Sequence, residues 1–63
     1  MTPGQRLTQL RTQAGLSQDA LAEQLGVSRQ SVSKWETDGS IPDLNRLVKL
    51  STVFGVTLDE LVK

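Results

Sequence analysis

Four polar side chains near the middle of the chain have types and spacings suited to recognising a planar set of hydrogen-bonding groups. They are Arg29, Gln30, Ser33 and Lys34. A helix over this segment would carry all four on one face, because they are related by steps of three and four residues. A guanidinium can donate two parallel hydrogen bonds to guanine O6 and N7, and a glutamine amide can pair with adenine N6 and N7. Recognition of base edges is therefore one chemistry that this face could perform.

The same face has a simpler interpretation as the solvated side of an amphipathic helix, which is the commoner case when no wider pattern surrounds it. Val32 and Trp35 would form the apolar side of that helix. Because Trp35 lies three residues after Val32, we expect its ring in the core rather than as a platform on which bases stack. The secondary structure predicted on either side of this segment is needed to distinguish the two interpretations.

Residue types that the chain lacks limit the other chemistries. Its 63 residues include no histidine, no cysteine and no tyrosine. A hydroxyl nucleophile would therefore have no histidine partner, and disulfides and thiolate metal sites are excluded. The adjacent carboxylates of Asp59 and Glu60 are best explained as charges in the first turn of a helix. We expect no enzyme activity, no cofactor and no metal site.

Chain-wide properties indicate one small domain over residues 1–63. No apolar run approaches the ~20 residues of a membrane span, and the N-terminus does not resemble a signal peptide. We therefore expect a cytoplasmic protein with no membrane partner and no small-molecule ligand. Seven basic residues balance seven acidic ones. A neutral chain argues against a nucleic-acid partner, although four of the basic residues and only two of the acidic ones lie within 1–35.

Capping residues and glycines divide the chain into five short helices. We expect helices over 3–13, 18–25, 29–37, 44–54 and 58–62. The residues expected to begin them are Thr2, Ser17, Ser28, Asp43 and Thr57. The residues expected to close the first four in a left-handed conformation are Gly15, Gly26, Gly39 and Gly55. No segment alternates with a period of two, so the prediction is an all-α fold.

The apolar residues of these helices recur at helical spacing and are expected to face one core. They are Leu7, Leu10, Ala14, Ala20, Leu21, Ala22, Leu25, Val32, Trp35, Leu44, Leu47, Val48, Leu50, Phe54, Leu58, Leu61 and Val62. Only Gly26, Val27 and Ser28 separate the second and third expected helices, which must therefore cross at a steep angle. Ala22 supplies the small side chain that such a crossing requires, and Gly26 accepts a positive φ.

The stretch from Leu16 to Glu36 resembles the helix-turn-helix of the phage-repressor and Cro family of transcription regulators, the lambda repressor-like DNA-binding domains. The continuation through Pro42 to Leu61 is similar to the fourth and fifth helices of that family. The resemblance implies a compact five-helix domain that binds double-stranded operator DNA sequence-specifically. It also implies a transcription regulator, with repression as the expected role. The third helix would lie in the major groove.

The resemblance assigns roles to particular residues. Its base-reading positions match Arg29, Gln30, Ser33 and Lys34. Gln18 matches a residue that contacts the DNA backbone, and the hydroxyls that could also bind phosphate are those of Ser17, Ser28 and Ser31. Arg11 and Glu36 match a pair of opposite charges that link the first helix to the end of the third. The segment 37–40 departs from the family pattern, because it has an acidic residue where basic ones are common, so we expect weak binding per domain.

Two questions stay open at this point. Regulators of this kind usually bind two half-sites as symmetric dimers, so a homodimer is expected. Val56, Leu58 and Leu61 could form its interface, or they could cover the core of one subunit. A protein-interaction or antitoxin-like module with the same fold and little or no DNA binding is the alternative function. The neutral charge favours that alternative, and the polar third helix disfavours it.

Overall fold

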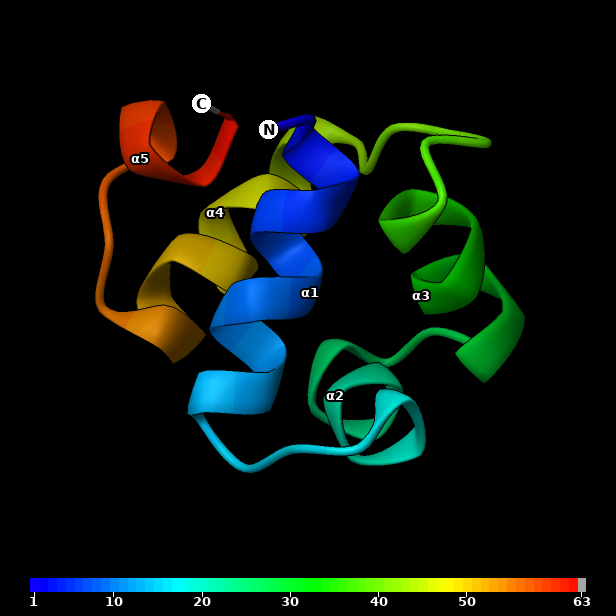
Figure 1. Ribbon diagram of the computed structural model, residues 1–63. Helices are drawn as coiled ribbons and strands as arrows, with labels where there is room; N and C mark the ends of the chain where they lie inside the picture. The colour runs from blue at the N-terminus through cyan, green and yellow to red at the C-terminus, as the bar shows by residue number, and fades with distance from the viewer. Residues whose placement is uncertain (63) are drawn as a thin grey trace.

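The computed structural model describes residues 1–62, and the side chain of Val62 lies outside the description. These residues form α1 (Pro3–Gln13), α2 (Gln18–Leu25), α3 (Arg29–Glu36), α4 (Leu44–Phe54) and α5 (Leu58–Val62), with no strand among them. In Figure 1, α1 runs through the middle of the view, with α2 and α3 on one side and α4 and α5 on the other. The predicted all-α, five-helix architecture is confirmed. Within the described part of the chain, every helix is too short or too polar to cross a membrane.

Local hydrogen bonds begin each helix where the sequence predicts. The side chain of Thr2 accepts from the Gln5 N–H, and the Gln5 side chain accepts from the Thr2 N–H, which completes a capping box. Thr57 and Glu60 form a second capping box at α5. At α2, α3 and α4 the side chain of the first residue accepts from the N–H three residues later; these residues are Ser17, Ser28 and Asp43. These caps involve residues only three apart, which is why the sequence alone reveals them.

The end of α3 differs from the prediction. The helix stops at Glu36, and Asp38 rather than Gly39 takes the left-handed conformation, with a φ of 62°. Among residues other than glycine, aspartate is one of those that tolerate this region best. Here the Oδ1 atom of Asp38 accepts a hydrogen bond from the Gly4 N–H at 2.9 Å. The prediction for Gly39 is therefore wrong, and the residue that closes α3 also contacts the start of α1.

One apolar core lies between the helices. Its buried members are Leu7, Leu10, Leu21, Ala22, Leu25, Val32, Trp35, Leu50 and Leu61. Four residues expected there are exposed instead: Ala14 at the end of α1, Leu44 and Val48 on α4, and Leu58 on α5. The α4 helix has apolar residues on two sides, and only the side with Leu47 and Leu50 packs on the core. Helical spacing could not show which of the two sides was the inner one.

Gly4 allows α1 to approach the end of α3 closely. A Cβ atom at this position would lie 2.6 Å from the carbonyl oxygens of Trp35 and Glu36. Both atoms belong to the backbone, so a side chain here would push the two helices apart. The first turn of α1 therefore rests directly on the last turn of α3. This contact sets how α3 is held against the rest of the domain.

A largely buried ion pair links the same two helices farther along. The Nε atom of Arg11 lies 2.6 Å from Oε2 of Glu36, and its Nη2 lies 3.2 Å from Oε1. The side chains of Arg11 and Glu36 are 14% and 5% exposed. The Nε2 atom of Gln18 also donates to Oε1 of Glu36, at 3.0 Å. One carboxylate thus joins α1, α2 and α3.

The ionisation of Glu36 is coupled to this arrangement. Burial raises the pKa of its carboxyl, but hydrogen bonds from Arg11 and Gln18 and the charge of Arg11 outweigh burial. The pKa of Glu36 therefore lies below its ordinary value of 4.5. A lowered folded-state pKa means that the ionised carboxylate stabilises the fold above the unfolded value. That contribution is lost as the pH falls through the folded-state value.

We expect Gly4→Ala to lower the free energy of unfolding by roughly 1–3 kcal/mol, because the added methyl overpacks against fixed carbonyl groups. Urea unfolding followed by circular dichroism would measure the change. Gly39→Ala is the matched control, since a Cβ atom there meets nothing nearer than 3.5 Å. Similar unfolding free energies for the two variants would contradict the close approach of α1 to α3.

We expect Glu36→Gln to destabilise the domain at pH 7 by up to about 3 kcal/mol, because it leaves the Arg11 charge largely buried without a partner. It should also reduce the loss of stability between pH 6 and pH 3, since the group with the lowered pKa is gone. Unfolding free energies across this range would test both effects. The exposed carboxylate of Glu23 provides the control Glu23→Gln. If Glu36→Gln and Glu23→Gln had the same pH dependence, Glu36 would not be the coupled group.

Candidate nucleic-acid interface

One side of α3 presents to solvent the residues that the sequence analysis assigned to base reading. Arg29, Gln30 and Lys34 are exposed, and Ser33 is half-buried. All four line one shallow depression in the surface, which we call the reading face. The opposite side of the helix is buried in the core through Val32 and Trp35. The structure therefore brings the four predicted residues together on an accessible face, and their base-reading role remains a prediction.

The α3 helix is held at both ends, which limits how far the reading face can move. Before it, the α2–α3 turn is closed by Gly26, with a φ of 70°, and by a 3.0 Å hydrogen bond from the Val27 N–H to the Ala22 carbonyl. After it, Glu36 and Asp38 contact α1, as described above. A helix fixed in this way can present side chains in a defined direction.

The residues predicted to bind phosphate all lie at the first turns of helices, where free N–H groups favour anions. Ser17 and Gln18 begin α2, and Ser28 and Ser31 lie in the first turn of α3. Each serine already takes part in a local contact. The Ser17 hydroxyl caps α2, and the Ser28 hydroxyl caps α3 and lies 3.1 Å from the Ser31 hydroxyl. The structure places these groups, and no ligand tests their role.

Gln18 has a second task that the sequence did not reveal. Its amide nitrogen donates one hydrogen to Glu36 at 3.0 Å. A glutamine amide carries two N–H donors, so one remains for another acceptor. The contact with Glu36 fixes the direction in which that second donor points. Gln18 is therefore part of the link between helices, and its role as a phosphate contact remains a prediction.

An acidic side chain stands beside the reading face. The Oδ1 atom of Asp19, in the first turn of α2, lies 3.6 Å from the Nε atom of Arg29. The two side chains are 79% and 57% exposed, so the pair is open to water. Sequence reasoning missed this contact, because it depends on how α2 and α3 cross. Among residues 1–62, Lys34 forms no ion pair with any carboxylate.

Two further residues were underestimated from the sequence. Asp38 was expected only to weaken phosphate binding, but its carboxylate binds the Gly4 N–H at the start of α1. Gly4 itself was not singled out. A glycine in the first turn of a helix lowers helix propensity, and that was the available signal of a close backbone approach.

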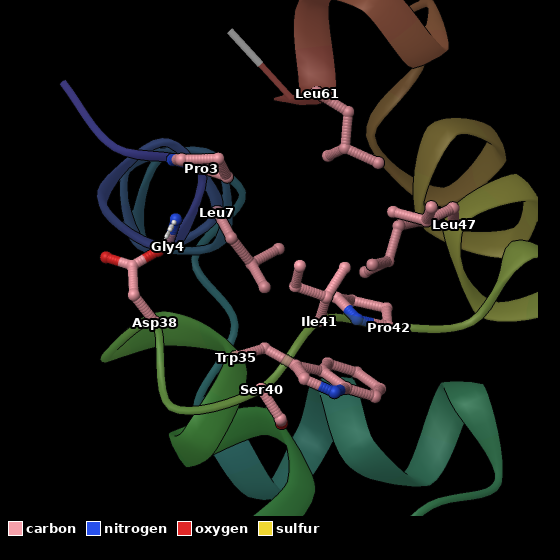
Figure 2. Close-up of a pocket in the computed structure, with 11 residues that line it drawn as sticks. Pro3, Gly4, Leu7, Trp35, Asp38, Ser40, Ile41, Pro42, Leu47 and Leu61 are labelled. Atoms are coloured by element: carbon pink, nitrogen blue, oxygen red, sulfur yellow. Dashed lines mark hydrogen bonds between the residues drawn. The ribbon is translucent and has the colours of Figure 1, made fainter.

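A further hollow in the surface is apolar and is lined by none of the residues of the reading face. Figure 2 shows Leu7, Leu47 and Leu61 converging above Ile41 and Trp35. The volume of this cavity is about 370 Å³. Its one charged group, Asp38, already binds Gly4, so the cavity offers little polar chemistry. Within residues 1–62, no three acidic side chains are grouped so that they could hold a metal ion.

Several known proteins resemble this chain in sequence and in fold. A sequence model of the helix-turn-helix family matches residues 7–61. The HTH-type transcriptional activator BcrR of Enterococcus faecalis is 48% identical over 58 residues, which is 92% of this chain and 28% of that protein. The P22 c2 repressor protein in complex with synthetic operator 9T is 30% identical, with a TM-score of 0.94 over 100% of this chain and 96% of that one. The biofilm master regulator SinR in complex with DNA is 34% identical, with a TM-score of 0.85 over 95% and 97% of the two chains.

The similarity covers nearly all of this chain but only part of some relatives. The chain spans 28% and 56% of the lengths of the first two curated relatives that it matches. The match extends from α1 into α5, so it includes the α2–α3 turn and the whole reading face. On this evidence, the protein belongs to the lambda repressor-like helix-turn-helix family.

Proposed function

We propose that this chain binds double-stranded DNA sequence-specifically as the reading domain of a transcription regulator. The observation that carries the proposal is the reading face, a polar surface on a helix held at both ends. The B-DNA major groove is about 12 Å wide and admits an α-helix such as α3. The P22 c2 repressor and SinR, both similar to this chain over nearly their whole length, are bound to DNA in their structures. This similarity supports a binding module rather than an enzyme.

In the proposed complex, the two groups of residues do different work. Arg29, Gln30, Ser33 and Lys34 would contact base edges and so determine the sequence. Phosphate contacts position a protein on the duplex without reading its sequence. The second N–H donor of Gln18 and the first-turn N–H groups of α2 and α3 fit that task. The serines that would assist them are Ser17, Ser28 and Ser31.

The proposal includes a homodimer, because two weak domains joined across one operator bind more tightly than either alone. The structure changes which surface is available for dimer formation. Leu61 is 3% exposed and Val56 packs against the core, so only Leu58 of the three residues considered from the sequence is exposed. Ile41, Leu44 and Val48 are exposed as well, and Leu44 and Val48 lie one turn apart on α4; we call these three the α4 group. We place the contact with a second copy at the α4 group.

Repression is the regulatory outcome that we propose, since a domain bound at a promoter blocks access by other proteins. The P22 c2 repressor supports this choice, while BcrR bears the name of an activator. The cytoplasm, where bacterial DNA lies, is the location that fits the proposed role. The site itself serves either outcome, because it recognises DNA in the same way.

We expect the chain to bind mixed-sequence duplex DNA saturably at low salt and to release it as salt is added, because phosphate binding displaces counterions. Arg29→Glu should abolish binding to the operator, once it is selected from a random DNA pool, and leave the helical content unchanged. Fluorescence anisotropy with a labelled duplex, together with circular dichroism, would measure both. Lys49→Glu is the matched control, because it makes the same charge change on an exposed position of α4.

Two results would count against this proposal. A folded chain that ignores duplex DNA at low salt would favour the protein-interaction or antitoxin-like module instead. An Arg29→Glu variant that binds as well as Lys49→Glu would remove Arg29 from the interface. Selection from a random DNA pool would then identify the operator, and inverted symmetry in it would support the homodimer.

We expect Val48→Glu to shift the chain from dimer toward monomer without unfolding it, because the side chain is 48% exposed in a single copy. Sedimentation equilibrium, with and without the selected duplex, would report the change in mass. Asn45→Glu is the control, since it adds the same charge to another exposed position of α4. Equal dimerisation of the two variants would place the interface elsewhere.

A further inference from the structure

We infer that Asp19 is a specificity-determining residue of the reading face, one that holds Arg29 in position to pair with guanine. The inference rests on the proposed DNA-binding function and concerns the same face. Its starting point is the 3.6 Å approach between Oδ1 of Asp19 and Nε of Arg29. The two residues come from different helices, so the contact spans the crossing of α2 and α3.

The geometry of the pair leaves the useful part of Arg29 free. A guanidinium has five N–H donors in one plane, one on Nε and four on the two terminal nitrogens. Because Asp19 faces Nε, it does not occupy the terminal pair. The pair is an ion pair without a hydrogen bond, and no side chain or carbonyl in residues 1–62 accepts a hydrogen bond from the terminal nitrogens of Arg29. The terminal fork, which matches guanine O6 and N7, stays available at the depression.

Holding the side chain in advance favours pairing with the correct base. A free arginine carries about 2 kcal/mol of rotamer entropy, part of which is lost when it binds. Asp19 restricts that freedom before DNA arrives. A partner that lies in another direction gains nothing from this orientation. In the proposed complex the terminal fork points toward a base edge, so the restriction favours a base contact over a backbone contact.

The charge of Asp19 acts in the same direction. Its carboxylate is 79% exposed beside a surface proposed to meet a polyanion. Repulsion from phosphates weakens binding to every sequence, whereas the Arg29–guanine pair offsets it only at the correct site. Specificity is a difference of affinities, and a repulsive group can increase that difference.

A purely structural role for Asp19 would be small. The Ser17 hydroxyl already caps α2, and a carboxylate in the first turn adds a modest dipole interaction. Exposed ion pairs typically contribute about 0.2–1 kcal/mol, which corresponds to at most about a fivefold change in an equilibrium. The free energy of an exposed ion pair therefore limits the effect of Asp19 on base preference to about fivefold.

The test compares base preference among variants at one pH and one salt concentration. A random duplex pool is selected with the unsubstituted protein, and affinities are then measured for the selected site and for its single-base variants. Arg29→Lys keeps the charge but loses the planar fork, so it marks the position that Arg29 reads. Asp19→Asn should lower the guanine preference at that same position by about two- to fivefold. It should also bind random duplex more tightly than the unsubstituted protein does.

Two further variants separate positioning from charge and folding. Glu23→Gln removes the same charge one helical turn farther along α2, from a residue that forms no ion pair within residues 1–62. It should tighten random binding slightly and leave the base preference unchanged. Asp19→Glu keeps a carboxylate within reach of Arg29 and should retain the preference. Thermal unfolding of each variant reports whether the fold is intact.

The outcomes distinguish this inference from the function on which it rests. If the unsubstituted protein is selective and Asp19→Asn has the same base preference, the role of Asp19 is overturned and DNA binding stands. A loss of preference at a position that Arg29→Lys does not affect would overturn it equally. If the unsubstituted protein binds no duplex at all, the proposed function fails and this inference fails with it.

Discussion

The carboxylate of Glu36 is the point at which three helices meet. It belongs to α3, accepts hydrogen bonds from Arg11 of α1 at 2.6 and 3.2 Å, and accepts another from Gln18 of α2 at 3.0 Å. A buried ion pair is weak evidence of net stability, since desolvation offsets much of its attraction. In this domain the ion pair instead fixes the orientation of α3. The α3 helix cannot tilt against α1 or α2 without breaking these bonds, and a reading face is useful only if its direction is fixed.

The sequence revealed those parts of the fold that depend on neighbouring residues. Ser17 and Asp43 begin helices through bonds to residues three positions later, and such bonds depend mainly on neighbouring residues. The end of α3 was mispredicted because distant residues decide it. Asp38 takes the left-handed conformation while binding Gly4, which lies 34 positions away. The inner side of α4 was ambiguous for a similar reason. Only packing against the other helices decides that Leu47 faces the core and Val48 faces solvent.

In the candidate site, too, the features that follow from local spacing were predictable and those that depend on helix packing were not. The grouping of Arg29, Gln30, Ser33 and Lys34 follows from helical spacing, so it could be predicted without coordinates. The approach of Asp19 to Arg29 depends on the crossing of α2 and α3 and on the reach of two side chains. The bond from Gln18 to Glu36 depends on the same crossing. Sequence reasoning therefore identified which residues form the reading face and missed those that orient it.

The neutral net charge argued against a DNA partner, but this argument weakens because several of the carboxylates lie away from the reading face. Glu36 is paired with Arg11, Asp38 binds the Gly4 N–H, and Glu60 caps its own helix through Thr57. These three charges are engaged within the domain and lie off the reading face. The face itself carries two cations, Arg29 and Lys34, opposed by Asp19 alone. Modest attraction to phosphate then makes the choice of base a larger share of the total affinity, which suits a domain that we propose to act in pairs.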